Sequence, residues 1–310
     1  MFSIDAWLEL LERLNRHRFR TALTTLSVAW GILMLVLLLG AGAGLGNMVA
    51  WEFRDDATNS IWIYRGATSM PYKGHPVGRT IQLTNEDHAA LAALPEVEHI
   101  TSRFYLRGEF TVSYRDRHGS FDVRSCHPDH QYIENTLVHS GRFLNDLDLN
   151  HRRKVAVIGD EVKEFLFREA DPLGEYIQVN RIPYRVVGVF HDVGGPGELR
   201  KIYIPITTAQ VAYGAGDRVH QIMFTIGGAS VEESAAIADG VREVLAERHH
   251  FDPEDPRALR VRNNLERYHE VAQIIVWIRG FVWIVGIGTV FAGVVGVSNI
   301  MLVSVQERTR

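Results

Sequence analysis

The sequence predicts a membrane protein of the α+β class, in which two transmembrane helices flank a large α+β domain with an inserted, mostly-β subdomain. Two observations lead to this prediction. Two long segments lack any charged residue, and the 228 residues between them contain many short β-prone runs and a few helical ones. The 310 residues carry a net charge of −4 and one cysteine. These values exclude a disordered chain, a disulfide-stapled miniprotein and a strongly basic nucleic-acid binder.

The two uncharged segments are long enough to cross a bilayer. Residues 21–51 form a run of 31, and residues 280–306 a run of 27. A bilayer core needs about 20 apolar residues in a helix, and a soluble helix is rarely apolar on every face. A cleaved signal peptide is the alternative for the first run, but its apolar core would be only about 7–15 residues long. We therefore predict transmembrane helices with stalks at 21–51 and 271–306.

Basic residues next to the two spans predict their orientation. Arg18 and Arg20 are among four arginines just before the first span, and Arg308 and Arg310 follow the second. Because positive residues flank spans on the cytoplasmic side, both ends of the chain are expected there, and residues 52–279 outside the cytoplasm.

Residues 1–20 are expected to form an amphipathic helix in the cytoplasmic interface of the membrane. The apolar residues that share one face at helical spacing are Ile4, Trp7, Leu8, Leu11 and Leu14.

The outer segment, residues 52–270, reads as a folded domain whose elements follow from local patterns. Short β-prone runs predict strands at 60–64, 154–159, 176–179, 184–190, 201–206, 221–226 and 259–262. The runs 110–114 and 121–124 predict a hairpin with its turn at His118–Gly119, and Asn180 predicts another turn. Helices are expected at 85–94, 161–167 and 230–248, and from about 265 into the second span. Ser230, with Glu233 three residues later, predicts a capping box at the start of the third of these helices.

The order of these elements predicts how the domain is divided. Outside residues 115–220 the elements read strand, helix, strand, and then strand, helix, strand again. That order is typical of an α+β layer. The mostly-β segment at about 115–220 then reads as a subdomain inserted into it.

Motifs that carry chemistry are absent from the sequence. It contains no phosphate-binding P-loop, no Gly-x-Ser-x-Gly and no His-Glu-x-x-His. The segment Cys126–His130 has residue types that bind metals, but its spacing matches no zinc site. Neither uncharged segment has an ionisable residue that could form an intramembrane ion relay. We therefore predict no catalytic residue, no metal site and no cofactor.

Small residues in both spans predict close helix packing. Pairs of small residues four apart let helix backbones approach closely in lipid. The residues in such positions are Gly40, Gly42, Gly44 and Gly46 in the first span and Gly288, Ala292 and Gly296 in the second.

An ordered series of short motifs resembles a known family. The motifs are Asn15–Leu26, Ser140–Phe143, Arg153–Gly159, Asp171–Gly174, Arg185–Val189, Ile202–Pro205, Thr208–Gln210 and Val297–Arg310. In this order they resemble the macrolide-exporter (MacB) and FtsX-like permeases of bacterial ABC transporters, across nearly the whole chain.

The resemblance implies a multi-pass protein of the bacterial inner membrane with a cytoplasmic N-terminus and residues 52–279 in the periplasm. It implies a homodimer that couples ATP hydrolysis to motion of the periplasmic domain, for export or for mechanotransmission. Because no ATPase domain precedes the first span here, the resemblance implies a separate cytosolic ATPase subunit and no enzymatic activity in this chain. It leaves open whether a periplasmic adaptor binds.

The resemblance also implies where the ATPase binds. Family members continue beyond the second span into a cytoplasmic coupling helix and two further spans, so this chain is expected to be truncated. The coupling segment would begin at 307–310. The residues expected at the ATPase interface are Gln306, Glu307, Arg308, Thr309 and Arg310.

Two other classes of protein share the predicted topology. A two-span sensor with a periplasmic ligand-binding domain would need a signalling domain after the second span. An anchored enzyme would need a cluster of catalytic residues.

Overall fold

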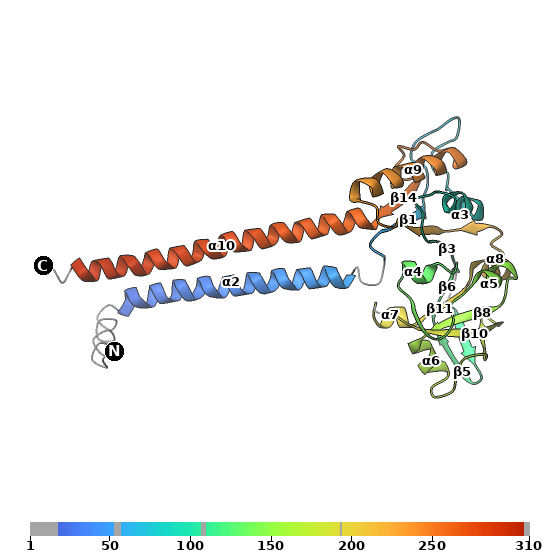
Figure 1. Cartoon of the computed structure of the whole chain (residues 1–310), viewed down its shortest axis with the longest axis horizontal. Helices are drawn as coiled ribbons and strands as arrows, with labels where there is room; N and C mark the ends of the chain where they lie inside the picture. Colours follow the sequence, from blue (N-terminus) through green and yellow to red (C-terminus); the bar gives the residue numbers. More distant parts are fainter. Residues whose placement is uncertain (1–17, 53–56, 107–109, 193, 307–310) are drawn as a thin grey trace. The chain divides into compact units, whose positions relative to one another are not determined.

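The computed structural model describes residues 18–52, 57–106, 110–192 and 194–306 (Figure 1). The chain divides into two compact units, of which one contains the two long helices and the other comprises residues 50–269. Most of the predicted amphipathic helix, residues 1–17, lies outside the described residues. Arg18 begins the first long helix.

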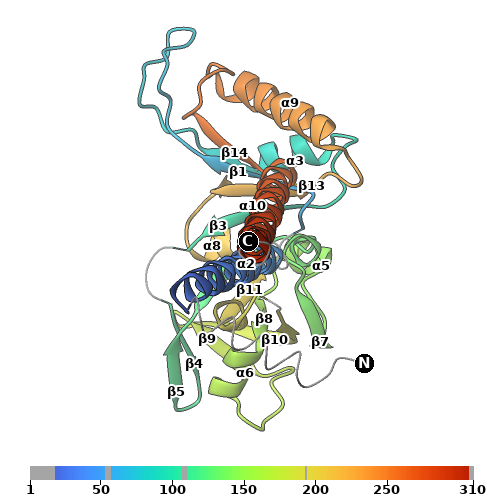
Figure 2. The same cartoon turned by 90° about the vertical axis from the view of Figure 1, so that its left-hand side faces the viewer.

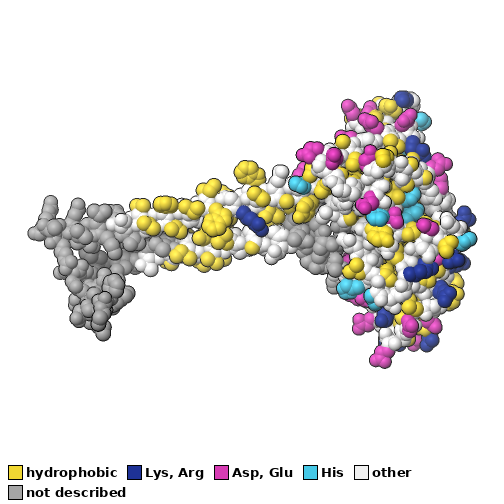
Figure 3. All heavy atoms as spheres, in the orientation of Figure 1, with side chains coloured by type: hydrophobic (Ala, Val, Ile, Leu, Met, Phe, Trp, Pro, Cys, Tyr) yellow, Lys and Arg dark blue, Asp and Glu magenta, His cyan; other side chains and the backbone are white. Residues whose placement is uncertain are grey.

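The two long helices are α2 (Arg18–Glu52) and α10 (Asn264–Gln306). At 1.5 Å per residue they are about 52 and 64 Å long, more than the roughly 30 Å of a bilayer core. The stretches Ala29–Met48 and Asn264–Val295 are long and apolar enough to cross a membrane, and only 11% of each is buried within the chain. Hydrophobic side chains predominate among the coloured side chains of the two helices in Figure 3. A buried core helix of a soluble protein would not leave this surface exposed.

Residues 50–269 are built on one continuous mixed sheet with the strand order β14-β1-β13-β3-β6-β11-β8-β10-β9-β4-β5, and β7 also pairs with β10. We call four strands the first strand group: β1 (Ser60–Arg65), β3 (Ile100–Tyr105), β13 (Gln221–Thr225) and β14 (Leu259–Asn263). The second strand group contains β4 (Thr111–Tyr114), β5 (Arg117–Ser120), β6 (Asp122–Cys126), β7 (Leu137–Gly141), β8 (Val155–Gly159), β9 (Tyr176–Val179), β10 (Ile182–His191) and β11 (Lys201–Pro205). Figure 2 shows β1 and β14 at one end of the domain and β4 and β5 at the other.

In the described part of the main sheet, the backbones of the two strand groups are paired where β3 lies next to β6. Two residue pairs make this junction, Phe104 with Ser125 and Tyr105 with Arg124. The second group comes from one continuous stretch, residues 111–205, which begins four residues before the predicted insertion and ends inside it. A separate short pair of strands, β2 (Leu83–Thr84) and β12 (Arg218–Val219), lies off the main sheet.

The helices of this domain follow the sequence signals where those were strong. Helix α9 (Val231–His249) begins with the predicted capping box, in which Glu233 N–H donates to Ser230 Oγ at 3.2 Å. The other helices are α3 (Asn85–Ala92), α4 (His130–Ile133), α5 (Asp146–Asn150), α6 (Asp160–Leu166), α7 (Pro196–Leu199) and α8 (Ile206–Ala212). The main hydrophobic core runs beneath both strand groups.

The predicted hairpin between 110–114 and 121–124 is wrong. β4 pairs instead with β5, through a tight turn that holds Arg115 at a φ of 53°. Gly119, which had suggested a turn, lies inside β5, where a Cβ atom would come within 3.0 Å of the Phe121 and Phe165 rings. This glycine therefore serves close packing. The segment after it forms β6, which pairs with β3 and β11.

The predicted turn at Asn180 is confirmed between β9 and β10. Asn180 and Arg181 have φ angles of 47° and 68°, as the favoured two-residue hairpin turn requires.

Candidate functional site

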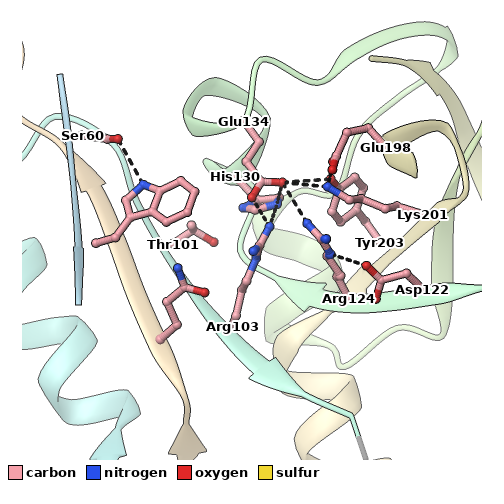
Figure 4. Close-up of polar contacts among 12 residues, drawn as sticks. Ser60, Thr101, Arg103, Asp122, Arg124, His130, Glu134, Glu198, Lys201 and Tyr203 are labelled. Atoms are coloured by element: carbon pink, nitrogen blue, oxygen red, sulfur yellow. Dashed lines mark hydrogen bonds and ion pairs between the residues drawn. The ribbon is translucent and has the colours of Figure 1, made fainter. Parts of the chain in front are cut away.

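A cluster of charged side chains is buried where the two strand groups meet (Figure 4). At its centre is Glu134, which follows α4 and whose side chain is only 6% exposed. Arg103 of β3 donates to its Oε1 atom. Arg124 of β6 donates to Oε2 at 3.4 Å, and the hydroxyl of Tyr203 on β11 donates to the same oxygen at 3.2 Å. One carboxylate therefore binds both strand groups.

Acidic side chains balance the remaining cations of this cluster. Lys201 of β11 lies 3.8 Å from Glu134 and contacts Glu198 of α7. Arg124 also donates to Asp122 at 2.7 Å. Burial lowers the pKa of Lys201 to about 8, although Glu134 opposes this shift. Burial alone would raise the pKa of Glu134, but its cationic neighbours, Arg103 first, hold it well below its usual range. Glu134 is therefore ionised at neutral pH.

His130 completes the cluster as a neutral imidazole. Burial lowers its pKa to about 4. Its Nε2 atom lies 3.2 Å from both the Arg103 guanidinium and the Glu134 carboxylate. A neutral ring nitrogen either donates or accepts, so Nε2 serves only one of these partners, according to the tautomer. The cluster contains no activated nucleophile, and its chemistry is that of a structural clamp.

The segment Cys126–His130 does not converge on one site. His127 accepts from Ser102 N–H, Asp129 accepts from Ile100 N–H, and His130 faces Glu134. Cys126 is fully buried, which raises its pKa. Within the described ranges, no group of three or more His, Cys, Asp or Glu side chains could hold a metal ion.

A second site is the joint between β14 and α10, which the sequence prediction missed. Asn263, the last residue of β14, caps the helix: its Oδ1 atom accepts from Leu265 N–H at 3.1 Å and Glu266 N–H at 3.3 Å. Its amide donates to Ser234 Oγ of α9 at 2.8 Å. The strand therefore passes into the helix with no linker between them. The asparagine pair 263–264 before an apolar helix was the available signal.

The next residue fixes this joint to the neighbouring strand. The amide of Asn264 donates to Ser60 Oγ at 2.9 Å, and the indole of Trp62 donates to the same oxygen at 3.1 Å. Ser60 and Asn264 are 0% and 1% exposed. Ser60 begins β1, the first strand after α2, and β1 pairs directly with β14. The sheet thus receives the chain from α2 and returns it to α10 on adjacent strands.

Most of the predicted helix-packing glycines that the structure describes lie away from the contact between α2 and α10. Around Gly40, Gly42, Gly44 and Gly288, a Cβ atom would have no neighbour within 4 Å. At Gly46 it would lie 3.1 Å from the Arg279 guanidinium. Ala292 is exposed, and the surroundings of Gly296 are not described. These residues remain predictions for contact with another chain.

Two other glycines let α2 and α10 approach each other. A Cβ atom on Gly31 would overlap the methyl group of Thr289, and one on Gly286 would overlap a methyl group of Leu35. Both glycines are buried between the helices. The sequence did not predict this role for Gly31 and Gly286, because neither belongs to the predicted pairs of small residues four positions apart.

Replacing Gly31 or Gly286 by leucine should loosen the helix pair, because an added side chain has no space at either crossing point. Overpacking of this kind costs about 1–3 kcal/mol. We expect a lower thermal transition of the detergent-solubilised chain, followed by circular dichroism. Leucine at Gly280 of α10, where a Cβ atom would have no neighbour within 4 Å and which is not a predicted packing residue, is the matched control. An equal loss in both sets would contradict the assignment.

The expected ATPase interface lies at the end of α10. Gln306 is the last residue of this helix. Glu307, Arg308, Thr309 and Arg310 lie outside the described residues, so this interface stays a prediction.

Sequence comparison links the chain to proteins of known family. The family described as MacB-like periplasmic core domain matches residues 21–243. The macrolide export ATP-binding/permease protein MacB of Vibrio parahaemolyticus is 27% identical over 99% of this chain and 46% of its own length. The pyoverdine export ATP-binding/permease protein PvdT of Pseudomonas syringae pv. syringae is 30% identical over 95% of this chain and 43% of its own length. The chain thus spans less than half the length of these curated relatives.

Two solved structures share the fold. The periplasmic region of MacB from Actinobacillus actinomycetemcomitans has a TM-score of 0.56 at 20% identity, and the match covers 72% of this chain and 95% of that one. The extracellular domain of the transporter YknZ from Gram-positive bacteria has a TM-score of 0.55 at 18% identity, over 66% of this chain and all of that one. At these identities the likeness concerns the fold.

Proposed function

The chain belongs to the MacB-like permeases of ABC transporters, and from this premise we propose that it is a permease subunit that couples the work of a separate cytosolic ATPase to motion of its periplasmic domain. The predicted resemblance and fold class are confirmed by the family match and the two flanking apolar helices. The finer statements below are proposals.

The observation that carries the proposal is the joint between β14 and α10. A helix that is capped by the last residue of a strand transmits its displacement to that strand without a flexible linker. The Asn264–Ser60 hydrogen bond spreads the same displacement to β1. The uncharged spans fit this role, since ion or solute paths through a membrane are lined by polar or ionisable groups.

We propose the following membrane arrangement on the basis of the flanking arginines. Residues 1–20 lie at the cytoplasmic surface, 21–51 and 271–306 form the spans with their stalks, 52–270 form the periplasmic core domain, and 307–310 begin the coupling segment. The exposed glycines of α2 and α10 are proposed to face a second copy of the chain in a homodimer. Membership of the permease family speaks against the sensor alternative.

The proposal extends to export and leaves the cargo open. The relatives are named for two different cargoes, a macrolide and pyoverdine. The contacts described above do not distinguish between these two cargoes.

Co-purification with the ATPase subunit tests the proposal. Replacing Glu307 and Arg308 by alanine in the full-length protein should reduce recovery of the ATPase on a tagged permease at least several-fold. The matched control replaces Arg168 and Glu169, an exposed pair in the outer domain, and should leave recovery unchanged. Equal recovery from both variants would overturn the assigned contact.

A further inference from the structure

The junction between the two strand groups contains a row of hydrogen bonds in which side chains replace a strand backbone. From the ladder pair Phe104–Ser125 onward, three amides of β3 donate to side chains of the segment 125–129. The three bonds are Phe104 N–H to Ser125 Oγ at 3.2 Å, Ser102 N–H to His127 Nδ1 at 3.0 Å, and Ile100 N–H to Asp129 Oδ2 at 3.3 Å.

These bonds continue the antiparallel register of β3 and β6. Each step moves two residues back along β3 and two residues forward along the partner segment, in line with the ladder pair Phe104–Ser125. The backbone of the partner segment leaves the sheet after Cys126, where β6 ends. Side-chain acceptors then satisfy the amides of alternate β3 residues, which would otherwise be buried without partners. We call this row the side-chain seam.

The central bond of the side-chain seam depends on the protonation of His127. Nδ1 accepts a hydrogen bond only while it carries no proton. Ring stacking adds a second constraint: the His127 ring lies on the His88 ring of α3 with their centroids 4.0 Å apart and their planes 7° apart. His88 Nδ1 also lies 2.9 Å from Ser102 Oγ. One β3 residue thus binds both imidazoles.

The charged and titratable groups around this pair favour its neutral state. His127 faces His88 from α3 and His130 from α4, and Ser102 from β3 supplies its hydrogen bond. Burial, followed by the neighbouring His88, lowers the pKa of His127 well below its usual value, and burial lowers that of His88 to about 4. Asp129, the acid of the side-chain seam, has its Oδ2 atom 3.8 Å from Nδ1 of His99.

We propose that the side-chain seam is an acid-sensitive hinge: protonation of the stacked His88–His127 pair removes the acceptor of Ser102 N–H, and the second strand group then turns away from the first. Each group keeps its own ladder. The Glu134 cluster persists as the pivot, because Glu134 stays ionised in the same pH range. This inference goes beyond the proposed function, since it concerns the outer domain alone and requires no ATPase.

The direction of the pH effect follows from linkage. A histidine whose pKa is depressed in the closed state favours that state at neutral pH, and this preference is lost as the pH falls below about 6.5 toward the depressed value. With a closed-state pKa of about 4, His88 alone should raise the ratio of open to closed molecules roughly 30-fold between pH 7.5 and pH 5.

The test measures the distance between the two strand groups in the full chain held in lipid nanodiscs. Spin labels are placed on cysteines that replace Glu247 on α9 and Glu169 after α6, both exposed, while the native Cys126 is fully buried. Double electron–electron resonance should show one distance at pH 7.5 and a second, longer population at pH 5. The far-UV circular dichroism should stay constant.

A non-titrating variant separates the hinge from general acid effects. His127→Asn keeps an acceptor at the position of Nδ1 and should show a smaller long-distance population at pH 5 than the wild type, because only His88 still titrates. The double variant His127→Asn/His88→Gln should show the single short distance at both pH values. His118→Asn, at an exposed position on β5, should respond like the wild type. If His127→Asn does not fold, His88→Gln should weaken the response. An unchanged distance in the wild type, an equal response in the His127 or His88 variant, or a loss of secondary structure at pH 5 would overturn the proposal.

Discussion

Replacing Glu134 by glutamine should destabilise the outer domain by about 3–5 kcal/mol, the range seen when one partner of a buried ion pair is removed. The variant leaves the buried Arg103 and Lys201 and the partly buried Arg124 around a neutral amide. Because these cations come from both strand groups, their repulsion acts at the junction of the two groups. Urea unfolding followed by tryptophan fluorescence measures the change.

Asp122→Asn is the matched control for this prediction. Asp122 pairs with the same Arg124, but its side chain is 52% exposed. Exposed pairs contribute about 0–1 kcal/mol. If Glu134→Gln and Asp122→Asn had similar small effects, the buried cluster would not stabilise the junction.

Inserting Gly-Ser-Gly between Asn263 and Asn264 should uncouple the movement of α10 from the sheet of the outer domain. The insertion separates the cap of α10 from its first turn and moves the Asn264 amide away from Ser60. We expect ATP-driven export by the full-length assembly to fall at least tenfold while the ATPase rate falls less than twofold. A flexible insertion absorbs the displacement of the helix before it reaches the sheet.

The same insertion between Lys73 and Gly74 is the control, because these residues form an exposed tight turn with φ angles of 44° and 85°. Export should be preserved in this variant. Full export by the joint variant, or an equal loss of export in both, would show that the joint does not transmit motion.

Local sequence patterns predicted the elements that depend on interactions between residues close together in the chain. The charge-free runs gave both long helices, and the Ser230–Glu233 pair marked the start of α9. Strand β3 was missed because Arg103, a charged residue in its centre, does not suggest a buried strand. Arg103 is tolerated there because it pairs with Glu134, which also pairs with Arg124. Both of these residues come from other segments of the chain.

The Glu134 cluster could not be predicted for the same reason. Its members lie on β3, β6, β11 and the segment after α4, which only the sheet topology brings together. The sequence also could not predict which glycines of the two spans face the neighbouring helix. Which small residues face the partner helix depends on the rotation of both helices, and that rotation places Gly31 and Gly286 inside and Gly40 and Gly288 outside.

Packing explains the glycines in the motifs that carry the family resemblance. Gly141 and Gly188 are paired in register between β7 and β10. A Cβ atom on Gly141 would overlap the Val187 carbonyl, and one on Gly188 would overlap the Arg142 carbonyl. Gly141 also has a φ of 76°, where other residues are strained. The two motifs therefore form one close contact between strands.

The most direct test of the account measures motion of the outer domain during the ATP cycle. In the proposed homodimer of the full-length protein, spin labels at position 247 in both copies would report the distance between the two outer domains. We expect a change of several ångströms between the nucleotide-free and ATP-bound complexes, and no change when the joint carries the Gly-Ser-Gly insertion. Identical distances in both nucleotide states of the unmodified complex would contradict it.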